Sequence, residues 1–139
     1  MTLSKKTAPV PTGMAHTMTQ VVGDGTNDHT VDPANKNVRS GPATLYGVVF
    51  DNTVTASGAE WLKMYNVVDD TLVAGTSKPV LIIPAIAIAT NPVSAGMPVV
   101  FIPGGVGFSE GISLLVSGEA GDAVSSVPAQ ATNVFLVTD

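Results

Sequence analysis

One stretch of this 139-residue chain, residues 97–118, joins two apolar runs through a glycine-rich connector. The runs cover residues 97–102 and 112–116, and both have the length and the β-branched content of strands. Four glycines separate them, at positions 104, 105, 107 and 111. Such a cluster is typical of a β-corner, where the backbone needs positive φ or a close approach, and not of a helix start. The stretch therefore predicts two strands with an ordered turn between them, and we expect Phe101 and Leu114 to lie in the core.

The rest of the chain repeats this style of short apolar run and Pro, Gly, Asp or Asn break. Residues 59–68 (AEWLKMYNVV) contain several good helix formers, so a helix is possible there. Trp61, Tyr65 and the paired valines favour a strand instead. Further strands are expected at residues 45–50, at 80–83 before Pro84, and at 133–137. Six or seven short strands without a long helix predict an all-β fold, either a β-sandwich or a jelly roll.

The chain divides in composition near residue 42. Residues 1–42 are rich in Thr, Asn, Asp and Gly, and Val21-Val22 is almost their only apolar cluster. Such a segment cannot bury enough surface to form a core of its own. We expect an extended N-terminal arm over residues 1–42, either disordered or lying on a neighbouring subunit with residues 19–22 added to a sheet edge, and a β-sandwich domain over residues 43–139.

Charge is scarce in this sequence. Only 12% of residues are charged, against about 25% in an average soluble domain, and the net charge is −5. Weakly charged surfaces associate readily, which favours an oligomer or a subunit of a larger assembly. Lys5 and Lys6 are the only adjacent basic residues, so no nucleic-acid-binding patch is expected.

Three further classes of protein fit the sequence poorly. The chain has no cysteine, which excludes disulfides, thiolate catalysis and Cys-based zinc sites. Its most apolar run, residues 79–89, is about half the length of a membrane-spanning helix and contains Pro84, so no membrane partner is expected. The N-terminus has no apolar segment behind its lysines, and a secretory signal is not expected either.

Ser109 lies in a Gly107-x-Ser109-x-Gly111 pattern, which is the nucleophile-elbow pattern of serine hydrolases. An elbow needs a helix after the serine and a histidine later in the chain. Here a strand is expected after Ser109, and the two histidines, His16 and His29, both precede it. No dinucleotide-binding or P-loop pattern is present, so we expect no enzyme activity, no catalytic residue and no cofactor.

Acidic residues offer two weaker candidates. Residues 24–32 carry closely spaced oxygen donors, but they lack the glycine at position six and the glutamate at position twelve of a calcium loop, so a solvated turn is the simpler interpretation and no metal-binding residue is assigned. A carboxylate pair for glycoside hydrolysis would have to come from acids at strand ends or turns, where they are ordinary. Those acids are Asp51, Glu60, Asp69, Asp70, Glu110, Glu119 and Asp122.

Trp61 and Tyr65 fall on one face of the expected strand over residues 59–68. Exposed, they could stack on sugar rings, as in a carbohydrate-binding or receptor-binding module. A core or interface position is the alternative, because the chain has only seven aromatic residues to fill its interior.

Four segments together resemble a pattern found in small structural proteins of tailed-bacteriophage virions, especially capsid decoration (cement) proteins. The pattern has a strand ending in D/N-N-T, a strand of hydrophobic-K-hydrophobic-Y-D/N form, a GT-x-x-P entry, and a P-x-G segment leading to F-x-x-G-I/L. The matching residues are 50–53, 62–66, 75–79 and 103–112, so the resemblance covers about residues 41–118. The Ala/Ile-rich residues 83–95 are longer than the pattern and leave the number of strands there open.

The resemblance implies a non-enzymatic sandwich or jelly-roll subunit on the outer surface of the phage head. It implies that the major capsid protein is the partner, that the subunit self-associates as a homotrimer, and that an N-terminal arm contacts neighbouring subunits. A fibre, knob or neck component of the same virion is the alternative within this class.

Overall fold

The computed structural model describes residues 4–9, 16–23, 38–51, 59–68, 72–86, 99–124 and 133–139. These residues form nine strands and no helix, and hence no helix long and apolar enough to cross a membrane. The strands are β1 (Ser4–Pro9), β2 (Thr17–Val22), β3 (Arg39–Ser40), β4 (Ala43–Phe50), β5 (Ala59–Tyr65), β6 (Leu81–Ile86), β7 (Val99–Phe108), β8 (Gly111–Ser117) and β9 (Asn133–Thr138).

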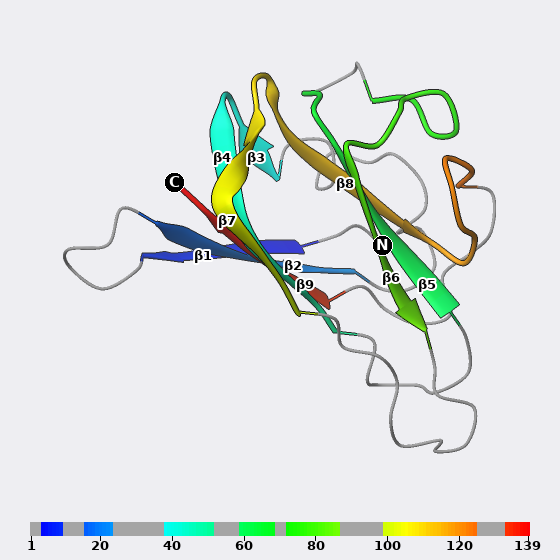
Figure 1. Ribbon diagram of the computed structural model, residues 1–139, viewed down its shortest axis with the longest axis horizontal. Coiled ribbons are helices and arrows are strands. Elements are labelled where there is room, and N and C mark those ends of the chain that lie inside the picture. The colour runs from blue at the N-terminus through cyan, green and yellow to red at the C-terminus, as the bar shows by residue number, and fades with distance from the viewer. Residues whose placement is uncertain are drawn as a thin grey trace.

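The strands form two antiparallel sheets that face each other (Figure 1). One has the order β1-β2-β9-β4-β7 and the other β3-β8-β5-β6. The pairs are nested: β2 pairs with β9, β3 with β8, β4 with β7 and β5 with β6. Such a folded-over hairpin of eight strands is the topology of a jelly roll, here with β1 added at one edge. The predicted all-β sandwich is confirmed.

The core lies between the two sheets. Successive side chains of a strand point to opposite faces, so each strand sends every second residue into the core. In strand β9, Val134 and Leu136 point into the core and alternate with the outward-facing Phe135 and Val137. Seven strands contribute to one buried cluster, which contains Val21, Val38, Ala43, Leu45, Val48, Phe50, Leu62, Met64, Ile83, Phe108, Ile112, Leu114, Val116, Val134 and Leu136. Leu114 is therefore in the core, as predicted.

Phe101 is not in the core, although the sequence predicted it there. Its side chain is 80% exposed on the outer face of the five-stranded sheet. The neighbours Val100 and Ile102 point the other way and pack against the core. In a run of four apolar residues the alternation of a strand must turn some of them outward, and the run itself does not say which.

Strand β7 continues through part of the connector that the sequence assigned to a turn. Gly104 and Gly105 have φ values of +80° and +74° and form a bulge inside the strand. On one side of the bulge Leu45 of β4 pairs with Val106 of β7, and on the other side Gly47 pairs with Phe101. The glycines thus bend β7 without ending it, and the corner between the sheets follows Phe108.

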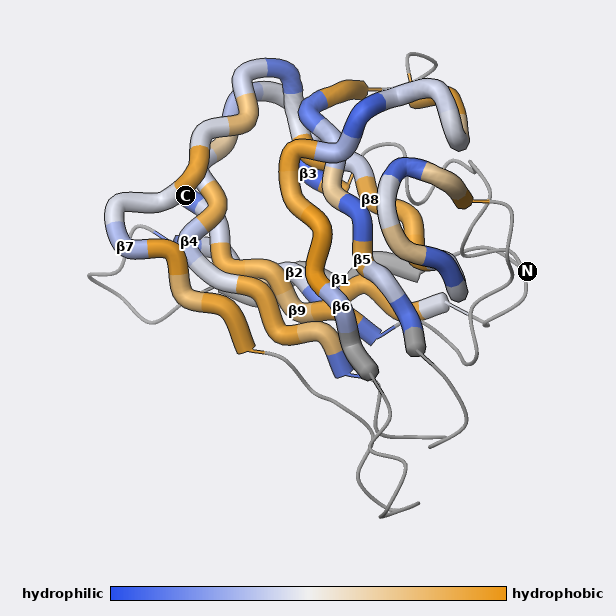
Figure 2. Tube along the Cα trace, turned by 45° about the vertical axis from the view of Figure 1, so that its right-hand side comes forward, coloured by the Kyte–Doolittle hydropathy of each residue, from blue (hydrophilic) through white to orange (hydrophobic). Residues whose placement is uncertain are grey.

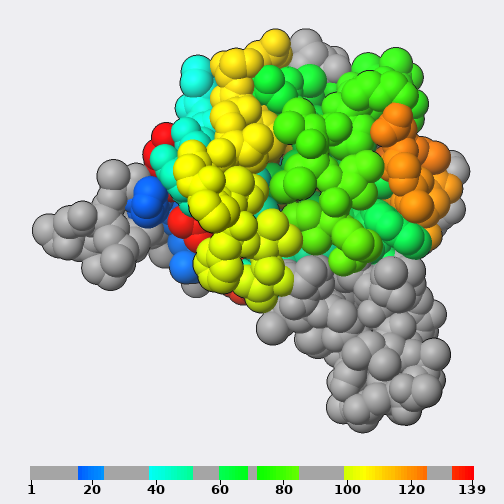
Figure 3. Space-filling view, viewed as in Figure 1, coloured from blue at the N-terminus to red at the C-terminus, as the bar shows by residue number. Residues whose placement is uncertain are grey.

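Strand β6 likewise continues past Pro84, where the sequence predicted a break. Pro84 lies opposite Trp61 of β5. Because β6 is the last strand of its sheet, a residue without an N–H can point its nitrogen away from the ladder at no cost in pairing. Figure 3 shows β7 (yellow) and the chain around β6 (green) covering adjoining parts of one face of the molecule.

The expected division at residue 42 does not separate the sandwich from the residues before it. Strand β2 pairs with β9 within the same chain, and Val21 and Val38 are core residues. Strand β3 pairs with the start of β8. Of the expected arm, residues 1–3, 10–15 and 24–37 lie outside the described residues, as do residues 87–95 of the long segment before β7.

Candidate functional site

The outer face of the five-stranded sheet is apolar across four strands. Cross-strand pairing places Val49 between Val99 and Phe135 in one row. The next row contains Phe101, Gly47, Val137 and Met18 in that order across the sheet. Figure 2 shows the hydrophobic residues (orange) along the neighbouring strands β7, β4 and β9. We call these seven residues the outer apolar face.

Gly47 leaves a hollow in the middle of this face. The groove above it has a volume of about 200 Å³ and is walled by Phe101, Phe135, Val137 and Met18. A Cβ atom at position 47 would lie 3.6 Å from the Val100 carbonyl oxygen and 3.9 Å from the Phe101 ring, which are ordinary contacts. The hollow therefore exists because residue 47 is glycine, and not because a side chain would be excluded.

The exposure of this face is unusual for an antiparallel sheet. Such sheets normally present alternating polar residues to water on the side away from the core. Here Phe101 is 80% exposed and Val99 49%, both on β7, and Met18 is 47% exposed on β2, with the apolar residues of β4 and β9 between them. A contiguous exposed apolar patch usually marks a binding surface, so the outer apolar face is the candidate functional site.

Part of the outer face of the other sheet is covered by the chain itself. Residues 118–124 pass over β8 and β5, and Val124 of this segment packs with Tyr65, Leu72 and Leu115 in a second buried cluster. Trp61 and Tyr65 share this face as predicted, but Tyr65 is fully buried. The pair therefore does not present two exposed rings to a sugar.

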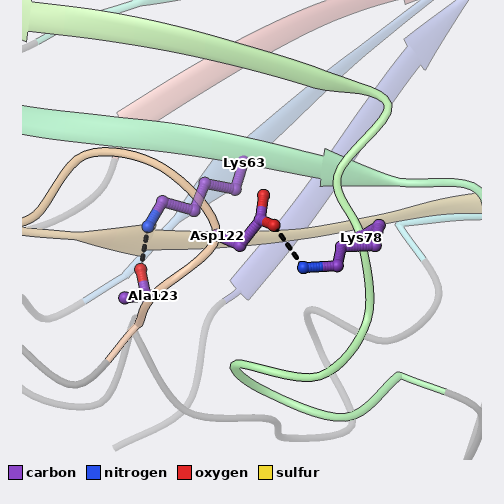
Figure 4. A network of polar contacts seen from close by, with 4 residues as sticks. All are labelled: Lys63, Lys78, Asp122 and Ala123. Carbon is purple, nitrogen blue, oxygen red and sulfur yellow. Dashed lines mark hydrogen bonds and ion pairs between the residues drawn. The ribbon is translucent and has the colours of Figure 1, made fainter.

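Lys63 anchors the covering segment. Its side chain is fully buried, and its amine donates a hydrogen bond to the carbonyl oxygen of Ala123 (Figure 4). Ser117 donates from the same sheet face to the carbonyl oxygen of Glu119 at 3.1 Å. Lys78 adds an exposed ion pair with Asp122 at 2.5 Å, which contributes little to stability. These polar groups hold the segment in place.

Burial shifts the two titratable groups under this segment. It lowers the pKa of Lys63 from its ordinary 10.5, and the nearby acids Glu119 and Asp122 offset only part of that effect. Burial also raises the pKa of Tyr65 to about 12, with a smaller contribution from Asp122. Burial is the main cause of both shifts.

Ser109 has a structural role in the corner between β7 and β8. Its hydroxyl accepts a hydrogen bond from the Asn66 amide at 3.0 Å, and the Asn66 oxygen accepts one from the Glu110 N–H at 2.9 Å. The residues after Gly111 form strand β8, so no elbow is present. His16 instead packs on Tyr46, with ring centroids 4.6 Å apart, and His29 lies outside the described residues.

The acidic candidates are dispersed. The loop 24–32, Asp69 and Asp70 lie outside the described residues. Asp51 accepts a hydrogen bond from the Asn133 amide at 3.2 Å, whereas Asp122 pairs with Lys78. Within the described ranges, no three His, Asp or Glu side chains come together as metal ligands would.

A second hollow, of about 400 Å³, lies beside the corner and is lined by Pro42, Thr44, Gly107, Ser109 and Asp139, among others. Its one charged lining group is already engaged, since the Asp139 carboxylate accepts from the Thr44 N–H at 2.8 Å. This bond is the main reason that the pKa of Asp139 lies below its ordinary value.

Sequence reasoning did not identify the outer apolar face, although a signal was present. Strands β4, β7 and β9 contain consecutive apolar residues (GVVF, VVFI and VFLV) where a half-exposed strand would alternate. Such runs are typical of strands that are covered on both faces. Comparison of the chain with protein-family models, with curated proteins and with solved structures gives no match.

Proposed function

We propose that this chain is a structural virion protein, a capsid decoration or cement subunit that binds the major capsid protein lattice of a tailed phage and stabilises the head. The observation that carries the proposal is the outer apolar face on a sparsely charged jelly roll. A contiguous apolar patch that contains an 80%-exposed phenylalanine is typical of a surface that is buried against another protein, as it would be in an assembly subunit.

The roles of the polar residues support the same class of function. The hydrogen bond of Lys63 holds the covering segment 118–124 in place, and those of Asn66 and Ser109 hold the corner between β7 and β8. A decoration subunit needs such rigidity, because its affinity comes from many weak contacts repeated over a symmetric lattice. The jelly roll also occurs in viral capsid proteins, which adds an analogy of fold and no more.

Co-sedimentation with phage heads tests the proposal. Heads assembled from the major capsid protein of the phage that carries this chain are mixed with the purified protein at increasing concentrations. We expect binding that saturates at a fixed number of copies per head and a rise in the temperature at which the heads fall apart. Heads already saturated with unlabelled protein are the control and should take up no labelled protein.

Absence of binding, with an unchanged head-melting temperature, would overturn the decoration proposal. Electron microscopy of virions labelled on this chain locates it independently. Label over the whole head supports decoration, whereas label only at the tail or neck would assign the chain to a fibre, knob or neck. Light scattering on the free protein tests the proposed homotrimer.

A further inference from the structure

The outer apolar face carries both a projection and a hollow. Phe101 projects from β7, the edge strand, and the groove above Gly47 lies on the adjacent strand β4. We propose that a second copy of this chain covers the face, with Phe101 of each copy inserted into the groove above Gly47 of the other. This contact goes beyond the proposed function, because it pairs two copies across a twofold axis whereas the expected homotrimer has threefold symmetry, and it does not depend on capsid binding.

The groove has the size of one aromatic ring. Its volume is about 200 Å³, and its lining is almost entirely apolar, with Val99, Val137 and Phe135 among the walls. A dry apolar cavity of roughly 150 Å³ already accommodates benzene in another protein. Phe101 is the most exposed of the large hydrophobic side chains in the described part of the chain, so it has the most apolar surface to bury on insertion.

Projection and hollow lie on one face, which makes that face self-complementary. When two identical faces meet across a twofold axis, each residue that contacts a partner residue is itself contacted by its counterpart. One rotation then places both phenylalanines over both glycines. A face with only a hollow, or only a projection, would need a different protein as partner.

Charge also favours a second copy. The chain has a net charge of −5, so two copies repel each other over most of their surfaces. The side chains that line the groove are all uncharged, and the acid beyond Val49 on β4, Asp51, accepts a hydrogen bond from the Asn133 amide. Copies that meet over the groove therefore bring no charged lining groups together.

The size of the face sets the strength of the contact. Four strands about 4.8 Å apart and two rows about 7 Å apart span roughly 270 Å² on each copy. Stable interfaces bury about 800 Å² on each partner, so this contact alone is weak. Pairs should accumulate at high concentration, or where a lattice holds copies next to each other.

Sedimentation equilibrium over a range of protein concentrations tests the contact with paired variants. Phe101→Ser removes the projection, and Gly47→Val fills the hollow. Each variant alone should weaken self-association at least tenfold. The matched control is Val80→Ser, because Val80 is 49% exposed but lies outside the outer apolar face, and its association should equal that of the wild type.

Mixing the two variants gives the sharper result. Phe101 is itself one wall of the groove, so the Phe101→Ser copy keeps a groove bounded by Val99, Phe135 and Val137. In a mixed pair, Phe101 of the Gly47→Val copy can still enter that groove, so one of the two insertions is retained. We expect mixed pairs to form more tightly than either variant pairs with itself. Mixing that brings no gain would overturn the reciprocal insertion.

Folding is checked by urea denaturation of each variant, and Gly47→Ala serves where Gly47→Val disrupts the strand, since a Cβ at this position meets only ordinary contacts. Wild-type protein that shows no concentration-dependent pairing, or pairing unaffected by Phe101→Ser, would overturn the proposal. Pairing without binding to heads would instead reject the decoration function and leave this contact intact.

Discussion

At the scale of single residues, the bulge in β7 places two neighbouring glycines in similar backbone conformations and different surroundings. Gly104 and Gly105 have φ values of +80° and +74°. A Cβ atom at Gly104 would meet open space, whereas one at Gly105 would lie 2.3 Å from the Thr44 Cγ2 atom and 3.0 Å from the Tyr46 ring. The bulge is therefore pressed against β4 at Gly105 only.

Alanine substitutions at these two positions should separate the cost of backbone strain from the cost of a steric clash with β4. Gly104→Ala adds a left-handed alanine and should cost about 1–2 kcal/mol of unfolding free energy. Gly105→Ala adds the same strain together with a clash against a stiff β-branched side chain, and should cost roughly 3 kcal/mol or more. Urea denaturation measures both, and equal costs would mean that β7 does not approach Thr44 this closely.

The buried hydroxyl of Tyr65 predicts a dependence of stability on alkaline pH. Its pKa is about 12 in the folded protein against an ordinary value of 10.0. Above pH 10 the unfolded chain loses this proton while the folded chain keeps it, so the free energy of unfolding should fall by roughly 2–3 kcal/mol as pH rises to about 12. Urea denaturation of the wild type and of Tyr65→Phe across this range measures the fall in unfolding free energy. The part of the fall that Tyr65 causes should be absent in the variant.

Lys63 acts in the opposite sense and at lower pH. Because burial lowers its pKa below 10.5, the folded chain loses this proton before the unfolded chain does. Stability from this group therefore rises with pH as pH approaches 10.5. Lys63 is present in both proteins, so comparing wild type with Tyr65→Phe cancels its effect. A parallel decline in the two would contradict the buried position of Tyr65.

At the scale of elements, the two strands of the glycine-rich stretch differ in how they are covered. All seven residues of β8 are buried, between the core on one side and the segment 118–124 on the other. Strand β7 has the core on one side only. The same kind of apolar run thus gives a central strand in one case and an edge strand with an exposed face in the other.

Alanine substitutions should expose this difference. Leu114→Ala removes a fully buried side chain of β8 and should cost about 2–5 kcal/mol. Phe101→Ala removes a side chain that is exposed in a single copy, and should change the unfolding free energy by at most about 0.5 kcal/mol. Denaturation at low protein concentration keeps self-association out of the comparison, and equal costs would place Phe101 in the core after all.

The strands could be predicted from sequence where an apolar run ends in turn residues, as in β4 before Asp51, β5 and β9. Strands β1 and β3 have no such run, since their positions depend on pairing with distant strands. The bulge in β7 and the continuation of β6 through Pro84 also depend on the neighbouring strand and on the sheet edge. The candidate site depends on which side of β7 faces the core, which local sequence does not determine.

At the scale of the whole molecule, the strands described within the first forty residues belong to the two sheets of the sandwich. Strand β2 lies between β1 and β9, and β3 pairs with β8. Two of the four nested pairs therefore need residues 17–22 and 39–40. The core also needs Val21 and Val38.

Two truncations should behave differently. Removing residues 1–15 deletes only the edge strand β1 among the described strands, and the remainder should melt cooperatively. Removing residues 1–40 strips β9 of one neighbour and opens the core, and the product should show no cooperative transition. Thermal melts followed by near-ultraviolet circular dichroism distinguish the two, and a cooperative melt of the shorter product would restore the arm of residues 1–42.

The nesting of the strand pairs also determines when this protein can fold. Strand β9 is the last of the nine in the sequence, yet it lies in the middle of its sheet, between β2 and β4. On the ribosome, β2 and β4 are therefore synthesised about 110 and about 80 residues before the strand that joins them. Contacts of such long sequence separation form slowly, on the scale of milliseconds to seconds. The outer apolar face, which includes Phe135 and Val137 of β9, can therefore be completed only once β9 has been made, well after β2 and β4 have been synthesised.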